Sequence, residues 1–340
     1  MNLSPPDMVE AAVPRISVAM AVYNNALYLA EAIESILRQT FADFEYLIVN
    51  DGSTDASGAI IDDFARRDPR IRAIHQPNRG LVASLNRLIA EARAPLIARM
   101  DGDDVALPER FARQLAFLDA NPDYGVVGTS THDIDGAGRL SPNIDYHPLT
   151  HESFLASLEH GPWLCHPSVI MRTDLVRAVG GYRAAYRHCE DYDLWLRLAE
   201  RTRLCTIPDR LLHYRRTDDQ VSSKHAEEQL TGAAIAFQAY CERAAGRPDP
   251  TDGLDRLPLL GALDATFGRS GVARSVRARI VPNLVYAHST LKGDGFTMLL
   301  AHIRDGGARR GLWRTVARLL KLGEAGRAAR LATALLTARS

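Results

Sequence analysis

Three carboxylates crowd one short stretch of the chain, and such a cluster can hold a metal ion. The sequence LIARMDGDDVALPERF (residues 96–111) places Asp101, Asp103 and Asp104 on one loop. Adjacent carboxylates repel one another and lose hydration when buried, so they need a positive partner. A hard divalent cation, Mg²⁺ or Mn²⁺, prefers oxygen ligands and commonly shares them with a diphosphate, which it stabilises on departure. Gly102 allows a tight turn. The competing interpretation is a solvated turn before a helix.

Alternating strand and helix patterns surround this loop. Apolar strand patterns occupy residues 16–22, 45–50, 71–75, 95–100, 124–130 and 168–172, and helical patterns occupy residues 27–38, about 55–67, 81–92 and 108–120. This alternation predicts an α/β fold with a mainly parallel sheet covered on both faces. Ligands bind beyond the carboxyl ends of such strands. Three polar loops (23–25, 51–53 and 101–104) follow strand ends, so we expect them to lie at one edge of the sheet.

Composition limits the functional classes. The chain has 340 residues with 41 basic and 41 acidic side chains, and this balance predicts no nucleic-acid partner. Its four cysteines are widely spaced, which is typical of reduced thiols in a cytoplasmic protein. The first residues do not form a signal-peptide pattern, and no apolar run is long enough to span a membrane. We expect an N-terminal extension (1–14), a catalytic domain (15–225) and a mainly helical C-terminal region (226–340).

The C-terminal tail is basic and amphipathic. Residues 304–340 carry nine Lys or Arg side chains against two acidic ones. A helix over residues 309–322 would place its apolar side chains on one face, namely Leu312, Trp313, Val316, Leu319 and Leu320. This pattern is typical of peripheral attachment to a membrane surface. The same face could instead pack on the catalytic domain or on a second copy of the chain, so membrane contact and a homo-oligomer both stay open.

Five segments in order resemble glycosyltransferase family 2. They run from about Ile16 to Ser222 and read SVAMAVYNNALYLAEAIESILRQTFADFEYLIVNDGSTD, NRGLVASLNRLIAEARAPLIARMDGDD, HPSVIMR, VGGYR and EDYDLWLRLA. The resemblance implies the GT-A fold, a Rossmann-like and mainly parallel sheet flanked by helices, here with a helical C-terminal extension. It also implies an inverting enzyme that transfers a sugar from a nucleotide-diphosphate donor, most often a UDP-sugar, to an acceptor hydroxyl. The cofactor would be Mn²⁺ or Mg²⁺.

The resemblance assigns donor-site roles by motif position. The residues expected at the nucleotide or donor are Ala21, Val22, Tyr23, Asn24, Asp51, Asn78, Gly80, Asp101, Gly102, Asp103 and Asp104. A carboxylate at position 51 can accept a hydrogen bond from the imide of uracil, although an Asp-Gly turn without function would look the same. Asp101 and Asp103 would bind the metal, with His213 as a further metal- or diphosphate-contacting residue. Arg215 or Arg216 could assist the diphosphate, whereas Asn86 and His166 are expected to be structural.

An acidic pair supplies the candidate catalytic base. Direct displacement needs a base that takes the acceptor proton, and the resemblance implies Glu190-Asp191, of which we favour Asp191. Glu190 could raise the pKa of its neighbour or hold the acceptor. The competing interpretation is a pair of acids stabilised by the helix dipole. Trp195, four residues after Asp191, could pack against an acceptor sugar or fill the core.

The sequence does not identify the acceptor, and it allows two alternative functions. A saccharide or lipid-linked saccharide acceptor, in polysaccharide or glycolipid biosynthesis, would suit the resemblance. The QxxRW element of processive synthases is absent, which favours addition of one sugar per encounter. As an alternative, DGDDV matches the motif of phosphatases in which Asp101 would be the nucleophile and Asp103 the acid/base. A non-catalytic scaffold that binds sugar nucleotides is a second alternative.

Overall fold

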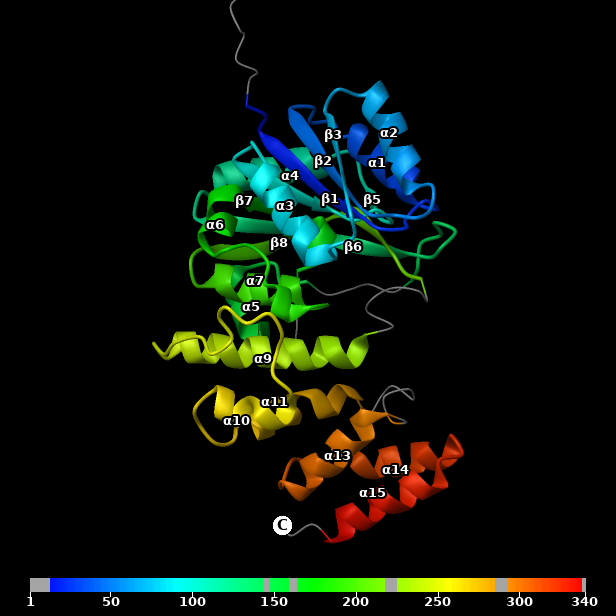
Figure 1. Cartoon of the computed structure of the whole chain (residues 1–340), viewed down its shortest axis with the longest axis vertical. Coiled ribbons are helices and arrows are strands. Elements are labelled where there is room, and N and C mark those ends of the chain that lie inside the picture. The colour runs from blue at the N-terminus through cyan, green and yellow to red at the C-terminus, as the bar shows by residue number, and fades with distance from the viewer. Residues whose placement is uncertain are drawn as a thin grey trace, which may run out of the picture. The chain divides into compact units, whose positions relative to one another are not determined.

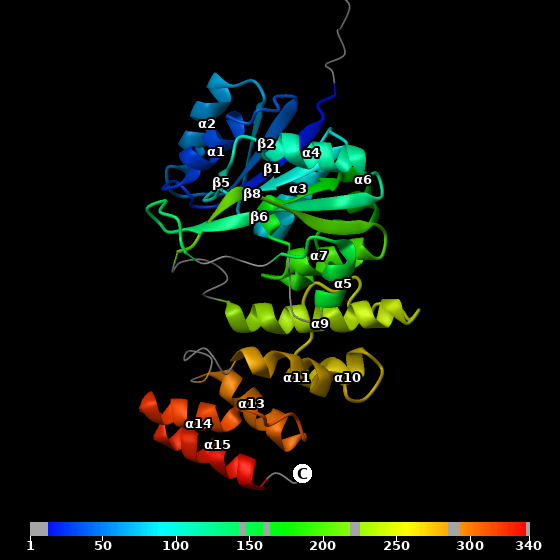
Figure 2. The same cartoon turned by 180° about the vertical axis from the view of Figure 1, so that it is seen from behind.

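The structure is a computed structural model that describes residues 13–142, 147–158, 164–217, 225–284, 291 and 293–337. The chain divides into two compact units (Figures 1 and 2). Unit 1 comprises Met1–Tyr182 and Arg197–Asp218, and unit 2 comprises Arg183–Leu196 and Asp219–Ser340. The domain limits expected from the sequence, 15–225 and 226–340, remain predictions.

A mixed, mostly parallel sheet forms the centre of unit 1. Its strands lie in the order β3-β2-β1-β4-β7-β6-β8-β5. They are β1 (Ile16–Val22), β2 (Phe44–Asp51), β3 (Ile71–Gln76), β4 (Leu96–Met100), β5 (Val105–Ala106), β6 (Tyr124–Ile134), β7 (Ile170–Arg172) and β8 (Arg203–Arg215). β1 to β4 are parallel, β6 is parallel to β8, and β7 runs antiparallel between β4 and β6. The carboxyl ends of β1 to β4, β6 and β8 therefore share one edge, and the predicted α/β class is confirmed.

Helices cover both faces of this sheet. α1 (Leu29–Leu37), α2 (Ser57–Arg67) and α4 (Arg110–Ala120) share an apolar core with the alternate side chains Val18, Met20 and Tyr46 of the strands. α3 (Leu81–Glu91) packs on β1 and β2, and it also contacts α6 (Thr173–Ala178) (Figure 1). Near-continuous burial of β1, β2 and β4 explains why their sequences are apolar throughout rather than alternating.

The last long strand, β8 (Arg203–Arg215), is not among the strands predicted from the sequence. β8 contains Pro208 and Asp209, which are rare inside strands. Its pairing with β6 moves from Thr129–Ile207 to Ser130–Arg210, so Pro208 and Asp209 fall in a bulge between the paired positions. Residues 218–224 lie outside the described part of the chain. The bulge allows the strand to continue to Arg215, next to the acidic loop.

Unit 2 is helical, as expected for the C-terminal region. Its longer helices are α9 (Ala226–Ala244), α11 (Val272–Leu284), α13 (Asp294–Arg304), α14 (Leu312–Lys321) and α15 (Ala325–Thr337). α11 packs between α9 and α13, and α13 to α15 enclose a separate apolar core (Figures 1 and 2). Within the described residues, no helix is long and apolar enough to cross a membrane.

The basic tail divides its apolar side chains between packing and solvent. Leu312 and Leu319 of α14 are buried, and Val316 packs on the same core. Trp313 and Leu320 remain 53% and 57% exposed. Packing on neighbouring helices of unit 2 therefore accounts for Leu312, Val316 and Leu319. Trp313 and Leu320 are left at the surface.

A buried carboxylate joins two segments of unit 2. Asp249 accepts hydrogen bonds from Nη1 of Arg183 (2.8 Å), Nη1 of Arg243 (2.6 Å) and the backbone N–H of Thr251 (2.9 Å). Its side chain is only 6% exposed. Burial alone would raise the pKa of Asp249, but the bonds from Thr251 and Arg183 outweigh it and hold the pKa at about 2.

We therefore expect Asp249→Asn to lower the free energy of unfolding by about 2 kcal/mol at pH 6. Because the folded-state pKa is depressed, this contribution is present above the unfolded pKa near 3.9 and is lost as the pH falls through about 2. Urea denaturation at pH 6 and pH 3 should show the difference from wild type shrinking by roughly half. Asp252→Asn, at a side chain that is 76% exposed and also faces Arg183, is the control and should change little.

Candidate functional site

The loops after β1 and β2 are tied together at the carboxyl edge of the unit 1 sheet. The N–H of Asn24 donates to Oγ of Ser53 (3.0 Å), and the N–H of Thr54 donates back to Oδ1 of Asn24 (2.8 Å). The N–H of Ala26 donates to Oδ2 of Asp55 (3.0 Å). Asn24 adopts a positive φ of 53°, a conformation that Asn tolerates better than most residues. The polar loop residues therefore fix one loop against the other.

Asp51 anchors the next loop of the same edge. Its Oδ1 accepts from Nε2 of Gln76 (2.7 Å) and from the N–H of Arg79 (2.9 Å), and its Oδ2 accepts from the N–H of Gly80 (2.8 Å). The carboxylate is 4% exposed. Asp51 thus holds the segment containing Asn78 and Gly80 beside its own strand. An Asp-Gly turn without function, the alternative considered from the sequence, would not require these bonds.

Gly52 permits a close approach of these two loops. It has a positive φ of 73°, and a Cβ at this position would lie 2.6 Å from the backbone nitrogen of Asn78. Of the residues expected at the nucleobase, Tyr23 is 51% exposed whereas the Val22 side chain is buried in the core. Val22 can therefore reach a ligand only through its backbone.

The acidic loop places three carboxylates close together, beside the guanidinium groups of Arg99 and Arg215. Nη2 of Arg99 lies 2.6 Å from Oδ1 of Asp101. Burial and the charge of Asp101 raise the pKa of Asp103 to about 6. Asp104 is 1% exposed, and burial together with both neighbouring carboxylates raises its pKa well above the usual range. Its Oδ2 is buried without a hydrogen-bond partner among the described residues. An unpartnered carboxylate oxygen and three clustered carboxyl groups, two of them with raised pKa values, fit a divalent cation at this loop.

Arg215, at the end of β8, holds the acidic loop in place. Its N–H donates to Oδ1 of Asp104 (2.8 Å) and its Nε donates to the carbonyl of Asp103 (2.7 Å). Its Nη2 contacts Glu31 at 2.7 Å, and its guanidinium carbon lies 4.3 Å from the centre of the Tyr28 ring. The side chain is buried and engaged in these contacts. These contacts indicate that Arg215 positions the loop, and assistance to the diphosphate by Arg215 or Arg216 stays a prediction.

Arg216 and the two histidines near this edge have less defined roles. Nε of Arg216 lies 3.0 Å from Oδ2 of Asp133. His213 pairs with Val105 across β5 and β8, directly after the acidic loop, and its ring centre lies 6.3 Å from that of His132. Burial and His132 lower the pKa of His213. In the described chain, His213 does not join Asp101 and Asp103 in a group of three mutually close ligand atoms, so its role as a metal ligand remains a proposal.

Two residues expected to be structural have structural contacts. Asn86 exchanges two hydrogen bonds of 2.8 Å with the backbone of Tyr182. Nε2 of His166 lies 2.7 Å from the hydroxyl oxygen of the same tyrosine, and burial lowers the pKa of His166 well below its usual value. The Asn86 bonds connect α3 to Tyr182, the last residue of the first segment of unit 1, and His166 holds the side chain of the same tyrosine.

The acidic pair and Trp195 belong to unit 2. Glu190 and Asp191 open α7 (Glu190–Ala199), where Glu190 is buried and Oδ1 of Asp191 accepts from the N–H of Tyr192 (2.7 Å). Trp195 is fully buried. Its burial favours the core interpretation over the acceptor contact, because an enclosed indole ring cannot stack on a sugar. The assignment of Asp191 as the base remains a proposal.

Comparison with solved structures defines the class of fold. The crystal structure of Staphylococcus aureus TarS 1–349 in complex with UDP-GlcNAc matches with a TM-score of 0.58 and 17% identity, covering 87% of this chain and 93% of that one. The mannosyltransferase PcManGT from Pyrobaculum calidifontis, in complex with GDP-Man and Mn²⁺, matches with a TM-score of 0.53 and 16% identity, covering 97% and 89%. The fold is therefore that of GT-A glycosyltransferases.

Sequence comparison gives the family. The model of Glycosyl transferase family 2 matches residues 17–180. EpsE of Bacillus subtilis (strain 168) is 34% identical over 239 residues, which are 68% of this chain and 83% of EpsE. The O-antigen biosynthesis glycosyltransferase WbnJ of Escherichia coli is 31% identical over 204 residues, covering 59% and 79%. The chain belongs to glycosyltransferase family 2, which confirms the resemblance and excludes the phosphatase interpretation of its DGDDV motif.

Proposed function

We propose that this protein is an inverting glycosyltransferase that moves a sugar from a UDP-sugar to a hydroxyl of a saccharide or lipid-linked saccharide. The observation that carries the proposal is that the Asp51 and Asp101–Asp104 loops follow the two parallel strands on either side of β1 and so lie at the same edge of the sheet. A donor of this class is also bound in the TarS complex with UDP-GlcNAc. The O-antigen role in the name of WbnJ supports polysaccharide or glycolipid biosynthesis.

The nucleotide would lie over the loops after β1, β2 and β3. Tyr23 is exposed at this edge, and Ala21 and Asn24 flank it. Asp51 would accept the imide N–H of the base through Oδ2, which accepts one bond in the described chain. Asn78 and Gly80 would approach the nucleotide through the loop that Asp51 holds.

The acidic loop would hold the metal and the diphosphate. Asp101 and Asp103 are the proposed ligands of Mn²⁺ or Mg²⁺, and His213, which pairs with Val105 on β5, is a further candidate. Gly102 lets the loop lie close to Asn25, because a Cβ at this position would be 3.3 Å from the Asn25 side chain. A bound cation would neutralise the charge that develops on the departing diphosphate. Asp104, which is buried on Arg215, would act on the donor only through its charge and its hold on the loop, not through direct contact with the sugar.

Asp191 would act on the acceptor. Its carboxylate would take the hydroxyl proton as the oxygen attacks the anomeric carbon from the face opposite the diphosphate. The new carbon–oxygen bond forms while the bond to the diphosphate breaks, so one displacement inverts the configuration. Glu190 would hold the acceptor or tune its neighbour.

Thermal denaturation with a panel of nucleotide sugars and Mn²⁺ tests the proposal. The true donor should raise the free energy of unfolding by about 2.7 kcal/mol at a hundredfold excess over its dissociation constant. Metal-dependent UDP release with a saccharide acceptor should follow. Donor binding without turnover across a broad acceptor panel would favour the scaffold, and absence of stabilisation by every nucleotide sugar would overturn the proposed function.

We also propose peripheral attachment of the tail to an anionic, cytoplasmic membrane surface. The exposed Trp313 and Leu320 lie seven residues apart on α14, among the basic side chains Arg310, Arg314 and Arg318. We expect the double change Trp313→Ser and Leu320→Ser to weaken binding to phosphatidylglycerol-containing vesicles by at least about tenfold.

Vesicle flotation of the full chain measures this binding. Leu336→Ser is the control, because that side chain is 75% exposed but belongs to α15 and not to the basic helix α14. The membrane proposal fails if wild type does not float or if the double variant floats equally well.

A further inference from the structure

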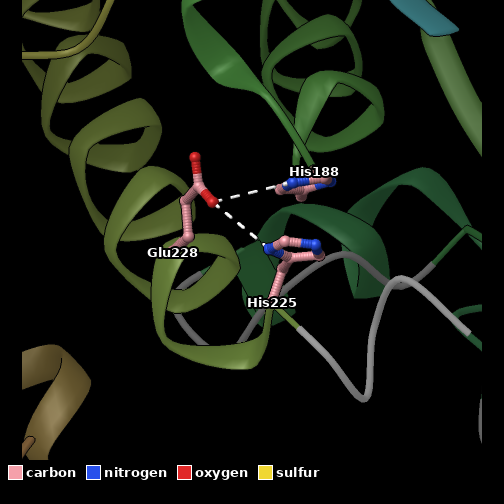
Figure 3. A group of neighbouring side chains, drawn as sticks. All are labelled: His188, His225 and Glu228. Atoms are coloured by element: carbon pink, nitrogen blue, oxygen red, sulfur yellow. Dashed lines mark ion pairs between the residues drawn. The ribbon is translucent and has the colours of Figure 1, made fainter. Parts of the chain in front are cut away.

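Two histidines and a glutamate of unit 2 converge outside the residues assigned to sugar transfer. Nε2 of His188 lies 3.6 Å from Oε2 of Glu228, and Nδ1 of His225 lies 3.5 Å from the same oxygen. The two imidazole rings are stacked, with centres 4.1 Å apart (Figure 3). One ligand atom from each residue lies within 4.8 Å of the other two. His188 comes from the turn before α7, and the other two from the start of α9.

The distances from the two histidines to Glu228 are too long for good hydrogen bonds, but they suit side chains that share one metal ion. At 3.5–3.6 Å they exceed the normal range of N–H···O bonds. A tetrahedral zinc site with bonds of about 2.1 Å has ligand–ligand edges of roughly 3.4 Å, which the two spacings to Glu228 approach. Because the lone pair of an imidazole nitrogen lies in the ring plane, the stacked rings would turn toward the ion when it binds. Nε2 of His188 is buried and has no hydrogen-bond partner among the described residues. A buried ring nitrogen in this state needs a partner, and a cation between the three side chains would supply it.

The backbone fixes His188 in this position. It has a positive φ of 68°, which is uncommon for a residue other than glycine. The following residue, Cys189, packs so closely on α9 that a Cβ at Gly232 would lie 2.4 Å from its Sγ. The turn before α7 is therefore held against α9 directly after His188, and a strained backbone held in this way is typical of a functional position.

We propose that His188, His225 and Glu228 form a Zn²⁺ site. A set of two imidazole nitrogens and one carboxylate oxygen suits zinc better than Mg²⁺ or Mn²⁺, which favour sites made mostly of oxygen ligands. His225 and Glu228 also line a cavity of about 1050 Å³ within unit 2, so water can complete the fourth position. The metal would fasten the turn that leads into Glu190 and Asp191 to α9. This site does not depend on the proposed function of the acidic loop.

Zinc titration of the full chain tests the site. The protein would carry Asp103→Ala, so that the acidic loop does not compete, and would be stripped with a chelator before titration against a chromophoric competitor. We expect about one Zn²⁺ per chain, and Co²⁺ in its place should give the visible absorption of a tetrahedral site. His225→Ala and Glu228→Gln should each weaken binding at least about tenfold.

The ligand variants are expected to fold, because the side chains that they replace are exposed. His225 and Glu228 are 41% and 55% exposed, and circular dichroism would verify that the variants fold. Glu227→Gln is the control, because it removes an adjacent carboxylate that is not in the group, and it should keep the parent's affinity. Absence of stoichiometric Zn²⁺ binding, or equal binding by parent and ligand variants, would overturn the site whether or not the chain transfers sugar.

Discussion

Asp191→Asn is expected to lower the rate of sugar transfer by at least about a thousandfold while donor binding stays nearly unchanged. The change removes the group proposed to take the acceptor proton, and general-base catalysis contributes roughly 10²–10⁴ in rate. Asparagine preserves the size of the side chain and keeps an oxygen that can accept from the N–H of Tyr192. Initial rates with saturating UDP-sugar, together with calorimetric donor affinities, would separate the chemical step from binding.

Glu190→Gln is the comparison for this prediction. Glu190 is buried beside Asp191, and we expect its loss to reduce transfer less severely. Wild-type turnover by Asp191→Asn would remove Asp191 from the mechanism. Loss of transfer in Glu190→Gln with activity retained in Asp191→Asn would make Glu190 the base.

Asp103→Ala is expected to weaken Mn²⁺-dependent binding of the UDP-sugar by at least about a hundredfold, because a direct ligand matters more than an outer-shell one. The pKa of Asp103 is already raised to about 6 by burial and by Asp101. Removing its charge should therefore relieve repulsion in the metal-free protein. Loss of donor binding without loss of thermal stability would thus indicate a ligand role.

Uridine provides the internal control, because it lacks the diphosphate and should bind Asp103→Ala as well as wild type. Asp119→Asn, an exposed carboxylate outside the site, should leave donor binding unchanged. If Mn²⁺ strengthens UDP-sugar binding equally in wild type and Asp103→Ala, the metal assignment of the acidic loop is wrong.

The arrangement of the sheet edge could be predicted because it follows from local patterns. Buried parallel strands have near-continuous apolar sequences, and parallel strands bring the loops after them to one edge. The expected strand at 16–22 matches β1, and the expected meeting of the 23–25 and 51–53 loops appears as the bond between Asn24 and Ser53. The other residues expected at the donor site were assigned from the motifs of the family.

Other features depend on contacts that a single sequence does not reveal. β8 was missed because Pro208 and Asp209 interrupt its pattern, and only the bulge opposite β6 accommodates them. Trp195 could not be oriented, because burial depends on what surrounds its helix. The positioning role of Arg215 was missed because Glu31 lies 184 residues away. His188 and His225 belong to no motif and meet only after folding.

The contacts of Arg215 have a consequence for redesign of the donor site. Its single side chain joins the acidic loop to α1 through Glu31 and to the carbonyl of Asp135 after β6 (3.1 Å). A lysine could not reproduce this set, since it lacks the planar fork of donors. Grafting the DGDD segment into a foreign scaffold would therefore succeed only if the recipient also received a matching guanidinium and its two anchor points, a carboxylate like Glu31 and a carbonyl like that of Asp135.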